Sequence, residues 1–290
     1  MSEATSRSAP RVLPASIELS PRAIAKDPGS VKLIPPGTRT YIVDAGDTSV
    51  PDWAAACLAL ARAGLVPVPH IACRRLRSRE EIDERLAAMV RAANVDDALV
   101  IGGDIAKPAG PFASSMDLLA TGLLERHAIR HIGVAGHPEG SPDIPPAAVV
   151  DALHWKIAFA ARTGIDLRLV TQFNFDADAA VAWSERLRAE GIRVPIHLGV
   201  AGPTTMTRLM KYAALCGVRT SLSFALKRKA ALTSLLGNYA PDPHVRAIES
   251  GVLSNEQSLI RQLHVYAFGG LPDAAEWLAG RGSWEARSKA

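Results

Sequence analysis

The sequence predicts a single (β/α)₈ barrel. Short apolar runs recur along its 290 residues, and each is followed by a turn and then by an Ala-, Leu- and Arg-rich stretch with helical periodicity. The runs are almost continuously apolar, which is typical of parallel strands buried on both faces. There are eight such runs, and they cover residues 16–19, 40–45, 66–72, 98–103, 131–136, 167–175, 194–200 and 264–269.

Helices are expected between these strands, at residues 52–64, 79–94, 115–127, 146–163, 177–191 and 204–215. Residues 217–253 form a longer segment than one crossover needs, so we expect an extended loop with extra helices before the last strand. An open doubly wound sheet is the alternative, but no GxGxxG fingerprint follows an early strand. Residues 1–14 are polar and lack an apolar signal region, which predicts a flexible leader before one barrel domain over 15–290.

Composition narrows the class of protein. The longest apolar stretches are interrupted well short of the roughly 18 to 20 residues that a membrane span needs. Cys57, Cys73 and Cys216 are odd in number and have no CxxC spacing, which argues against a disulfide framework or a structural zinc site and favours the cytoplasm. The net charge is +4, but basic residues are scattered and aromatic residues make up 5%, so a small anionic ligand is favoured over nucleic acid.

Polar side chains stand at the ends of most of these strands, where barrels carry their chemistry. Burying such groups costs about a few kcal/mol each unless they are paired or meet a ligand. Six of the eight runs end in polar residues, which are Glu18, Asp44, His70, Asp104, His137 followed by Glu139, and Gln172 followed by Asn174. Strand alternation predicts that Gln172 and Asn174 lie on the same face of their strand. Asp104 is also suited to cap a turn, and His70 to be a core histidine whose hydrogen bonds are satisfied.

A metal centre is not predicted from these groups. His70, His137, Asp44 and Asp104 are all possible ligands, but the first strand ends in a lone glutamate and carries no HxH pair. The sequence also has no GxSxG nucleophile elbow and no phosphate-binding P-loop.

Six motifs, in this order, resemble the methylenetetrahydrofolate reductase family over about residues 15–270. AGHPEG and TQFNFD are specific when they occur together, whereas any one motif alone would be weak. The six are SIELSP (16–21), PHIAC (69–73), GGD (102–104), IGVAGHPEGSPD (132–143), TQFNFD (171–176) and PTTMTRLMKYAALCGV (203–218).

The resemblance implies a (β/α)₈ barrel that reduces methylenetetrahydrofolate to 5-methyltetrahydrofolate with NADH or NADPH as hydride donor. Glu18 corresponds to the acid that protonates the methylene-bridging nitrogen. Asp104 would bind the pterin amide edge, and Gln172 would orient pterin or nicotinamide. The expected catalytic residues are therefore these three, and the substrate-binding residues are Asp104, Gln172, Asn174, Arg208 and Tyr212.

The departures from the family pattern suggest an enzyme without bound FAD. Asp44 stands in place of a flavin-contacting threonine, Gly102 in place of an arginine and His137 in place of a tyrosine. In relatives, the helix before TQF carries an aspartate and a lysine that bind flavin. Residues 153–164 of this chain match that helix poorly, and only Lys156, out of register, remains as a candidate for the lysine. We therefore expect the nicotinamide to lie where flavin lies in relatives, in a cofactor site of Asp44, His70, Gly102, His137 and Glu139.

Two other functions remain open at this point. The chain can also be interpreted as a flavin-containing reductase with a remodelled site, or as a folate- or nucleotide-binding subunit without catalysis. The expected partners are a folate and a nicotinamide dinucleotide, with neither nucleic acid nor membrane. The pattern does not distinguish NADH from NADPH, tetrahydrofolate from another one-carbon pterin, or one oligomeric state from another.

Overall fold

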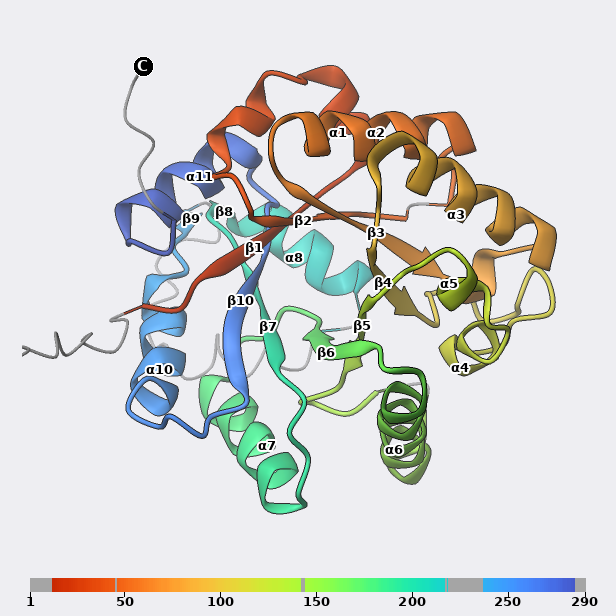
Figure 1. The fold of residues 1–290 in the computed structure, drawn as a ribbon. Helices are drawn as coiled ribbons and strands as arrows, with labels where there is room; N and C mark the ends of the chain where they lie inside the picture. Colours follow the sequence, from red (N-terminus) through yellow and green to blue (C-terminus); the bar gives the residue numbers. More distant parts are fainter. Residues whose placement is uncertain (1–11, 45, 142–143, 217, 219–236, 285–290) are drawn as a thin grey trace, which may run out of the picture.

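The computed structural model describes residues 12–44, 46–141, 144–216, 218 and 237–284. Parallel strands close into a barrel in the order β1-β10-β7-β6-β5-β4-β3-β2 (Figure 1), which confirms the predicted (β/α)₈ class. The barrel strands are β1 (Ala15–Leu19), β2 (Arg39–Ile42), β3 (Val66–Ala72), β4 (Asp97–Ile101), β5 (His131–Gly136), β6 (Asp166–Thr171), β7 (Ile196–Ala201) and β10 (Ile260–Tyr266).

Helices surround the ring of strands, and a short antiparallel pair, β8 (Thr204–Thr205) and β9 (Asn238–Tyr239), lies outside it (Figure 1). None of the helices in the described ranges is long and apolar enough to cross a bilayer. The helices are α1 (Pro21–Lys26), α2 (Val50–Arg62), α3 (Arg79–Ala93), α4 (Ser115–Leu119), α5 (Leu123–Arg126), α6 (Pro146–Thr163), α7 (Ala177–Ala189), α8 (Met206–Leu215), α10 (Asp242–Val252) and α11 (Leu271–Gly280), with 3-10 turns η1 (Ser30–Leu33) and η2 (Cys73–Arg75).

The predicted end of the strand at 167–175 was wrong. β6 stops at Thr171, so Gln172 and Asn174 do not share a face by alternation: Gln172 is exposed, whereas Asn174 is only 2% exposed. The close approach of β7 explains the stop. A Cβ on Gly199 would lie 2.4 Å from the Thr171 carbonyl oxygen, and the Gly199 N–H is bonded to the Thr171 hydroxyl instead (2.8 Å).

Other boundaries also differ from expectation. The helix expected at 115–127 is split into α4 and α5 at Gly122, which has a φ of 71° in the left-handed region that favours glycine. β10 begins four residues before the expected 264. α10 supplies an extra helix in the long segment before it, although 217 and 219–236 lie outside the described residues. Residues 1–11 of the expected leader also lie outside them, while Leu13 is buried and its N–H donates to Glu249 (2.7 Å).

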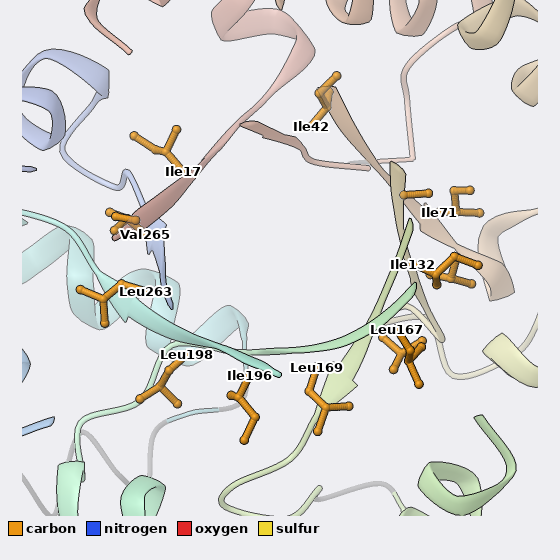
Figure 2. Packing of buried hydrophobic residues seen from close by; sticks show 14 of the residues in the cluster. Ile17, Ile42, Ile71, Ile132, Leu167, Leu169, Ile196, Leu198, Leu263 and Val265 are labelled. Carbon is orange, nitrogen blue, oxygen red and sulfur yellow. The ribbon is translucent and has the colours of Figure 1, made fainter. Parts of the chain in front are cut away.

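The main hydrophobic core lies between the barrel and its helices. Figure 2 shows the aliphatic side chains of the strands pointing outward from the ring, away from its centre. Alternation along each strand produces this arrangement because every second residue faces the helices. The core side chains labelled there are Ile17, Ile42, Ile71, Ile132, Leu167, Leu169, Ile196, Leu198, Leu263 and Val265.

The remaining strand side chains face the barrel interior, and many of them are polar. Asp97 accepts hydrogen bonds from Arg168 (2.6 Å) and from Arg39 (2.9 Å). The Asp97 and Arg168 side chains are only 1% and 6% exposed. Arg168 also donates to the Tyr41 hydroxyl (2.8 Å), and the Tyr41 ring packs with Val68. The charges are buried, but each has a close partner, as buried ions require.

Replacing Asp97 with Asn is expected to reduce the free energy of unfolding by about 3 to 5 kcal/mol, because Arg168 would keep a buried charge without its counterion. Denaturation in urea measures this loss. Asp166→Asn is the matched control: Asp166 pairs with His131 (3.1 Å) at the surface, so its loss is expected to stay below about 1 kcal/mol. Equal, small losses in both variants would contradict a structural role for the buried pair.

Candidate active site

Glu18 lies at the mouth of the barrel, near the end of β1, between two histidines. Its Oε2 is 3.5 Å from Nε2 of His264 on the neighbouring strand β10 and 3.6 Å from Nε2 of His70 on β3. Both nitrogens are buried and have no hydrogen-bond partner among the described residues. The Glu18 side chain itself is 14% exposed, so it is accessible from the mouth while most of it is enclosed.

Ser16 fixes the ring of His264. The Ser16 hydroxyl donates to the Leu263 carbonyl oxygen (3.2 Å), and its Oγ lies 3.2 Å from His264 Nδ1. The other ring nitrogen, Nε2, is thereby directed at Oε2 of Glu18.

His70 contributes an uncharged neighbour. Burial lowers its pKa to about 4, an effect that the Glu18 charge opposes and His264 reinforces. His70 is therefore neutral at neutral pH. Tyr41 meets the edges of both rings, with centroids 5.8 Å from His70 and 4.3 Å from His264.

Helix α8 covers the mouth end of the barrel. Its residue Leu209 packs with Phe173, which follows β6, and its Tyr212 ring stacks on Phe268 with centroids 4.2 Å apart. Figure 1 shows α8 in line with the bore of the barrel, behind the strands. Arg208 and Tyr212, the two expected substrate contacts on this helix, thus lie on the element that faces the mouth, with Arg208 exposed at its first turn.

Cys216 caps the C-terminal end of α8 and is exposed. Its pKa is nevertheless raised to about 11, first by burial of the thiol and then by the charges of Glu18 and Asp104.

Asn174 faces inward while Gln172 does not. Asn174 donates from Nδ2 to the Gly199 carbonyl oxygen (3.0 Å), and its buried Oδ1 has no partner within the described ranges. Gln172 is exposed, and its Oε1 accepts from the Phe173 N–H (3.1 Å). Of this expected pair, Asn174 retains an unused acceptor and Gln172 must turn to reach a ligand in the mouth.

Asp104 and Asp44 are each held by an arginine. Asp104 is 70% exposed and is bound in a bidentate manner by Arg75, at 2.7 Å and 2.9 Å from Nη2. Asp44 is buried and bonded to Arg85 of α3 (3.1 Å). A ligand therefore meets Asp104 at the rim with Arg75 beside it, whereas the Asp44 carboxylate is directed toward the surrounding helices.

The other expected cofactor residues lie on the loops after β4 and β5. Gly102 has no side chain, and a Cβ at this position would lie 3.5 Å from the guanidinium of Arg74. His137 is half-buried, and its pKa is lowered by burial and next by the charge of Lys156. Glu139 is exposed. Lys156 itself is buried on α6, and burial lowers its pKa. The charge of Lys156 thus acts on His137 from the neighbouring helix.

Several residues of the site were not expected from sequence. His264 and Tyr41 face Glu18 from the barrel interior, and Tyr266 donates from its hydroxyl to the Thr171 carbonyl oxygen (3.1 Å). A search limited to the polar residues that end the predicted strands missed them, because all three lie within strands, Tyr41 in β2 and His264 and Tyr266 in β10. Alternation within HVY and RTY marks these positions as inward-facing. No group of metal-ligating side chains is found in the described part of the chain.

Comparison with known proteins agrees with this architecture. The family model described as "Methylenetetrahydrofolate reductase" matches residues 40–267. The "5,10-methylenetetrahydrofolate reductase" of Pectobacterium carotovorum subsp. carotovorum is 30% identical over 159 residues, which is 54% of this chain and 51% of that protein. "Methylenetetrahydrofolate reductase 1" of Schizosaccharomyces pombe is 30% identical over 53% of this chain and 26% of its own length.

The match thus spans about half the length of the bacterial relative and a quarter of the yeast one. A solved structure of dihydropteroate synthase from Thermus thermophilus aligns with 96% of this chain and 95% of its own, at 16% identity and a TM-score of 0.48. That likeness adds nothing to the functional assignment. The family match, however, covers β2 to β10 and so includes most of the barrel. The chain belongs to the methylenetetrahydrofolate reductase family.

Proposed function

We propose that this chain reduces methylenetetrahydrofolate to 5-methyltetrahydrofolate by direct hydride transfer from a nicotinamide dinucleotide, with Glu18 as proton donor. The observation that carries the proposal is the Glu18 carboxyl group at the mouth of the barrel, with its Oε2 3.5 Å from His264 Nε2. Family membership supports the choice of substrate.

The reaction needs one proton and one hydride. The proton passes from Glu18 to the bridging nitrogen of the substrate, the bond from that nitrogen to the methylene carbon breaks, and an iminium cation forms. Hydride from the dihydronicotinamide then adds to the iminium carbon, giving the methyl group and the oxidised nicotinamide. The unused Asn174 Oδ1 and the Asp104 carboxylate are the groups that we assign to the pterin, and the walls of the mouth hold donor and acceptor carbons together.

The positions that would hold flavin do not fit it well. The Asp44 carboxylate is committed to Arg85 and is 2% exposed, so it offers no neutral hydroxyl to a flavin. Gly102 provides no side chain, and the neighbouring Arg74 guanidinium donates to carbonyl oxygens of Ile105 (3.3 Å) and Ala113 (3.0 Å). We therefore derive no step through flavin and assign the hydride directly to the dinucleotide.

Glu18→Gln is expected to keep the fold and lower the rate of reduction about 10²- to 10⁴-fold, because the amide cannot donate the proton that opens the ring. The assay follows oxidation of NADH in the presence of methylenetetrahydrofolate. Glu190→Gln, at an exposed helix end, is the matched control and should react at the parent rate. If Glu18→Gln reacts as fast as this control, Glu18 is not the acid.

His264→Gln is expected to lower the rate of reduction, because the Glu18 carboxyl group loses the ring that faces its Oε2 at 3.5 Å. The NADH assay measures this loss. A rate equal to that of the parent would show that His264 does not position Glu18.

Direct transfer predicts that purified protein, after exhaustive dialysis and without added flavin, oxidises NADH or NADPH when methylenetetrahydrofolate is supplied. Kinetics should be sequential, because donor and acceptor must occupy the mouth together. The visible spectrum shows whether flavin is bound, and the initial rates show whether the kinetics are sequential. A stoichiometric flavin absorption band, or activity that returns only on adding flavin, would favour the flavoprotein instead.

A further inference from the structure

A hollow of about 360 Å³ lies at the amino-terminal end of the barrel, opposite to the mouth that holds Glu18. Pro195, directly before β7, and Leu259, directly before β10, both line it. Its walls come from the turns that follow α7 and α10, and these two helices pack side by side (Figure 1). Because the loops at this end of a (β/α)₈ barrel lie away from the chemistry, the hollow is separate from the site at Glu18.

Positive charge is in excess around this hollow. Arg188, Arg193 and Arg261 line it, whereas Glu256 is the only carboxylate of its lining in the described part of the chain. Glu185 accepts from Arg188 Nε (2.9 Å) and so balances that one guanidinium group. Arg193 and Arg261 form no ion pair with the described residues. The charges therefore favour an anion as the ligand.

The guanidinium groups of Arg193 and Arg261 are held in place by uncharged acceptors. Arg193 Nη1 donates to the carbonyl oxygens of Arg188 and Ile192, both at 2.8 Å. Arg261 Nη2 donates to the Glu256 carbonyl oxygen (2.8 Å). Each of these bonds uses one nitrogen and neutralises no charge, so the other N–H groups can meet a ligand. A guanidinium group that is already oriented loses less conformational entropy when it binds.

Arg261 stands at an irregularity of the barrel. Along β10, Ile260 and Gln262 are paired with the consecutive β7 residues 196 and 197, so Arg261 is an extra residue between two pairs. Such bulges are rare between parallel strands, and they commonly re-aim a side chain beside a functional site. Arg261 is exposed and lines the hollow. The bulge therefore gives a structural reason for the position of this arginine.

The two walls of the hollow are joined to each other. Arg188 Nη1 donates to Gln257 Oε1 on the turn before β10 (3.2 Å), and Asn255 Nδ2 on the same turn donates to Glu185 Oε1 (3.1 Å). The walls do not have to be brought together when a ligand binds, which reduces the cost of binding. Small-molecule pockets range from roughly 300 to 1,000 Å³, so a hollow of this volume suits a compact metabolite.

We propose that this hollow binds a compact metabolite with two anionic oxygen groups, a bisphosphate or a polycarboxylate, which Arg193 and Arg261 hold. The fork of a guanidinium group matches pairs of phosphate or carboxylate oxygens. The ligand joins the turns before two neighbouring strands, β7 and β10, at the end of the barrel remote from Glu18. It therefore stabilises the folded protein by mass action and takes no part in the chemistry at the mouth. The proposal does not depend on the reductase activity.

Calorimetric titration with pyrophosphate and, separately, with citrate tests the hollow. The parent is expected to bind at least one of these probes. Arg193→Ala and Arg261→Ala are each expected to weaken that binding about tenfold or more, because a charge-assisted contact is lost. Both arginines are exposed, so the two variants should fold. Binding of pyrophosphate alone identifies phosphate esters as the ligand class, binding of citrate alone identifies polycarboxylates, and each result supports the site.

Arg91→Ala is the matched control. Arg91 is an exposed arginine on α3, outside the lining of the hollow, and its loss changes the net charge by the same amount. This variant should bind the probe as the parent does. If the parent binds neither probe, or if Arg91→Ala and the two hollow variants bind with equal affinity, the proposal is overturned.

Thermal unfolding gives a second readout that needs no catalysis. The probe that binds should raise the Tm of the parent and of Arg91→Ala, because it stabilises only the folded state. At the same concentration it should raise the Tm of Arg193→Ala and Arg261→Ala less. An equal rise in all four proteins would show that the probe binds elsewhere, and the hollow would then lose its assignment.

Discussion

The ion pair between Asp97 and Arg168 is the interaction on which the rest of the barrel interior depends. It places opposite charges 2.6 Å apart inside the ring, with Arg39 as a second cation on the same carboxylate (2.9 Å). Arg168 then fixes the Tyr41 hydroxyl, and the Tyr41 ring supports His70 and His264 beside Glu18. Two buried ions are costly unless they are held together, so the network fixes the relative positions of β2, β4 and β6, which carry its members.

The outer face of the strands explains how so polar an interior is tolerated. Every second residue of each strand packs against the helices in one large apolar cluster, and this cluster supplies the burial that stabilises the fold. The inner face is thus free to carry ions, imidazoles and hydroxyls. A barrel whose inner layers were aliphatic would be simpler to stabilise, but it would have no rigid support for a carboxyl group at its mouth.

Much of the fold was predictable from sequence, and less of the site. Eight apolar runs separated by helical stretches specify the barrel because parallel strands between helices have few other arrangements. Glu18 and His70 were identifiable as polar groups at strand ends, and they do meet (3.6 Å). Their contact with His264 was not predictable, because adjacency of β1 and β10 exists only after the barrel closes. The arginine partners of Asp44 and Asp104 also come from elements distant in sequence.

The hydrogen-bonded network below the site does not extend to Glu18 among the described residues. Tyr41 uses its hydroxyl to accept from Arg168 and lies 3.4 Å from Nδ1 of His197, while it meets His264 and His70 only through its ring. The hydrogen-bonded chain that starts at Asp97 therefore ends below the two histidines. The Glu18 side chain is 14% exposed at the mouth, so in the reaction that we propose solvent supplies its proton from that side. A folate in the mouth would close this route, and the proposed reaction therefore requires that Glu18 is protonated before the substrate binds.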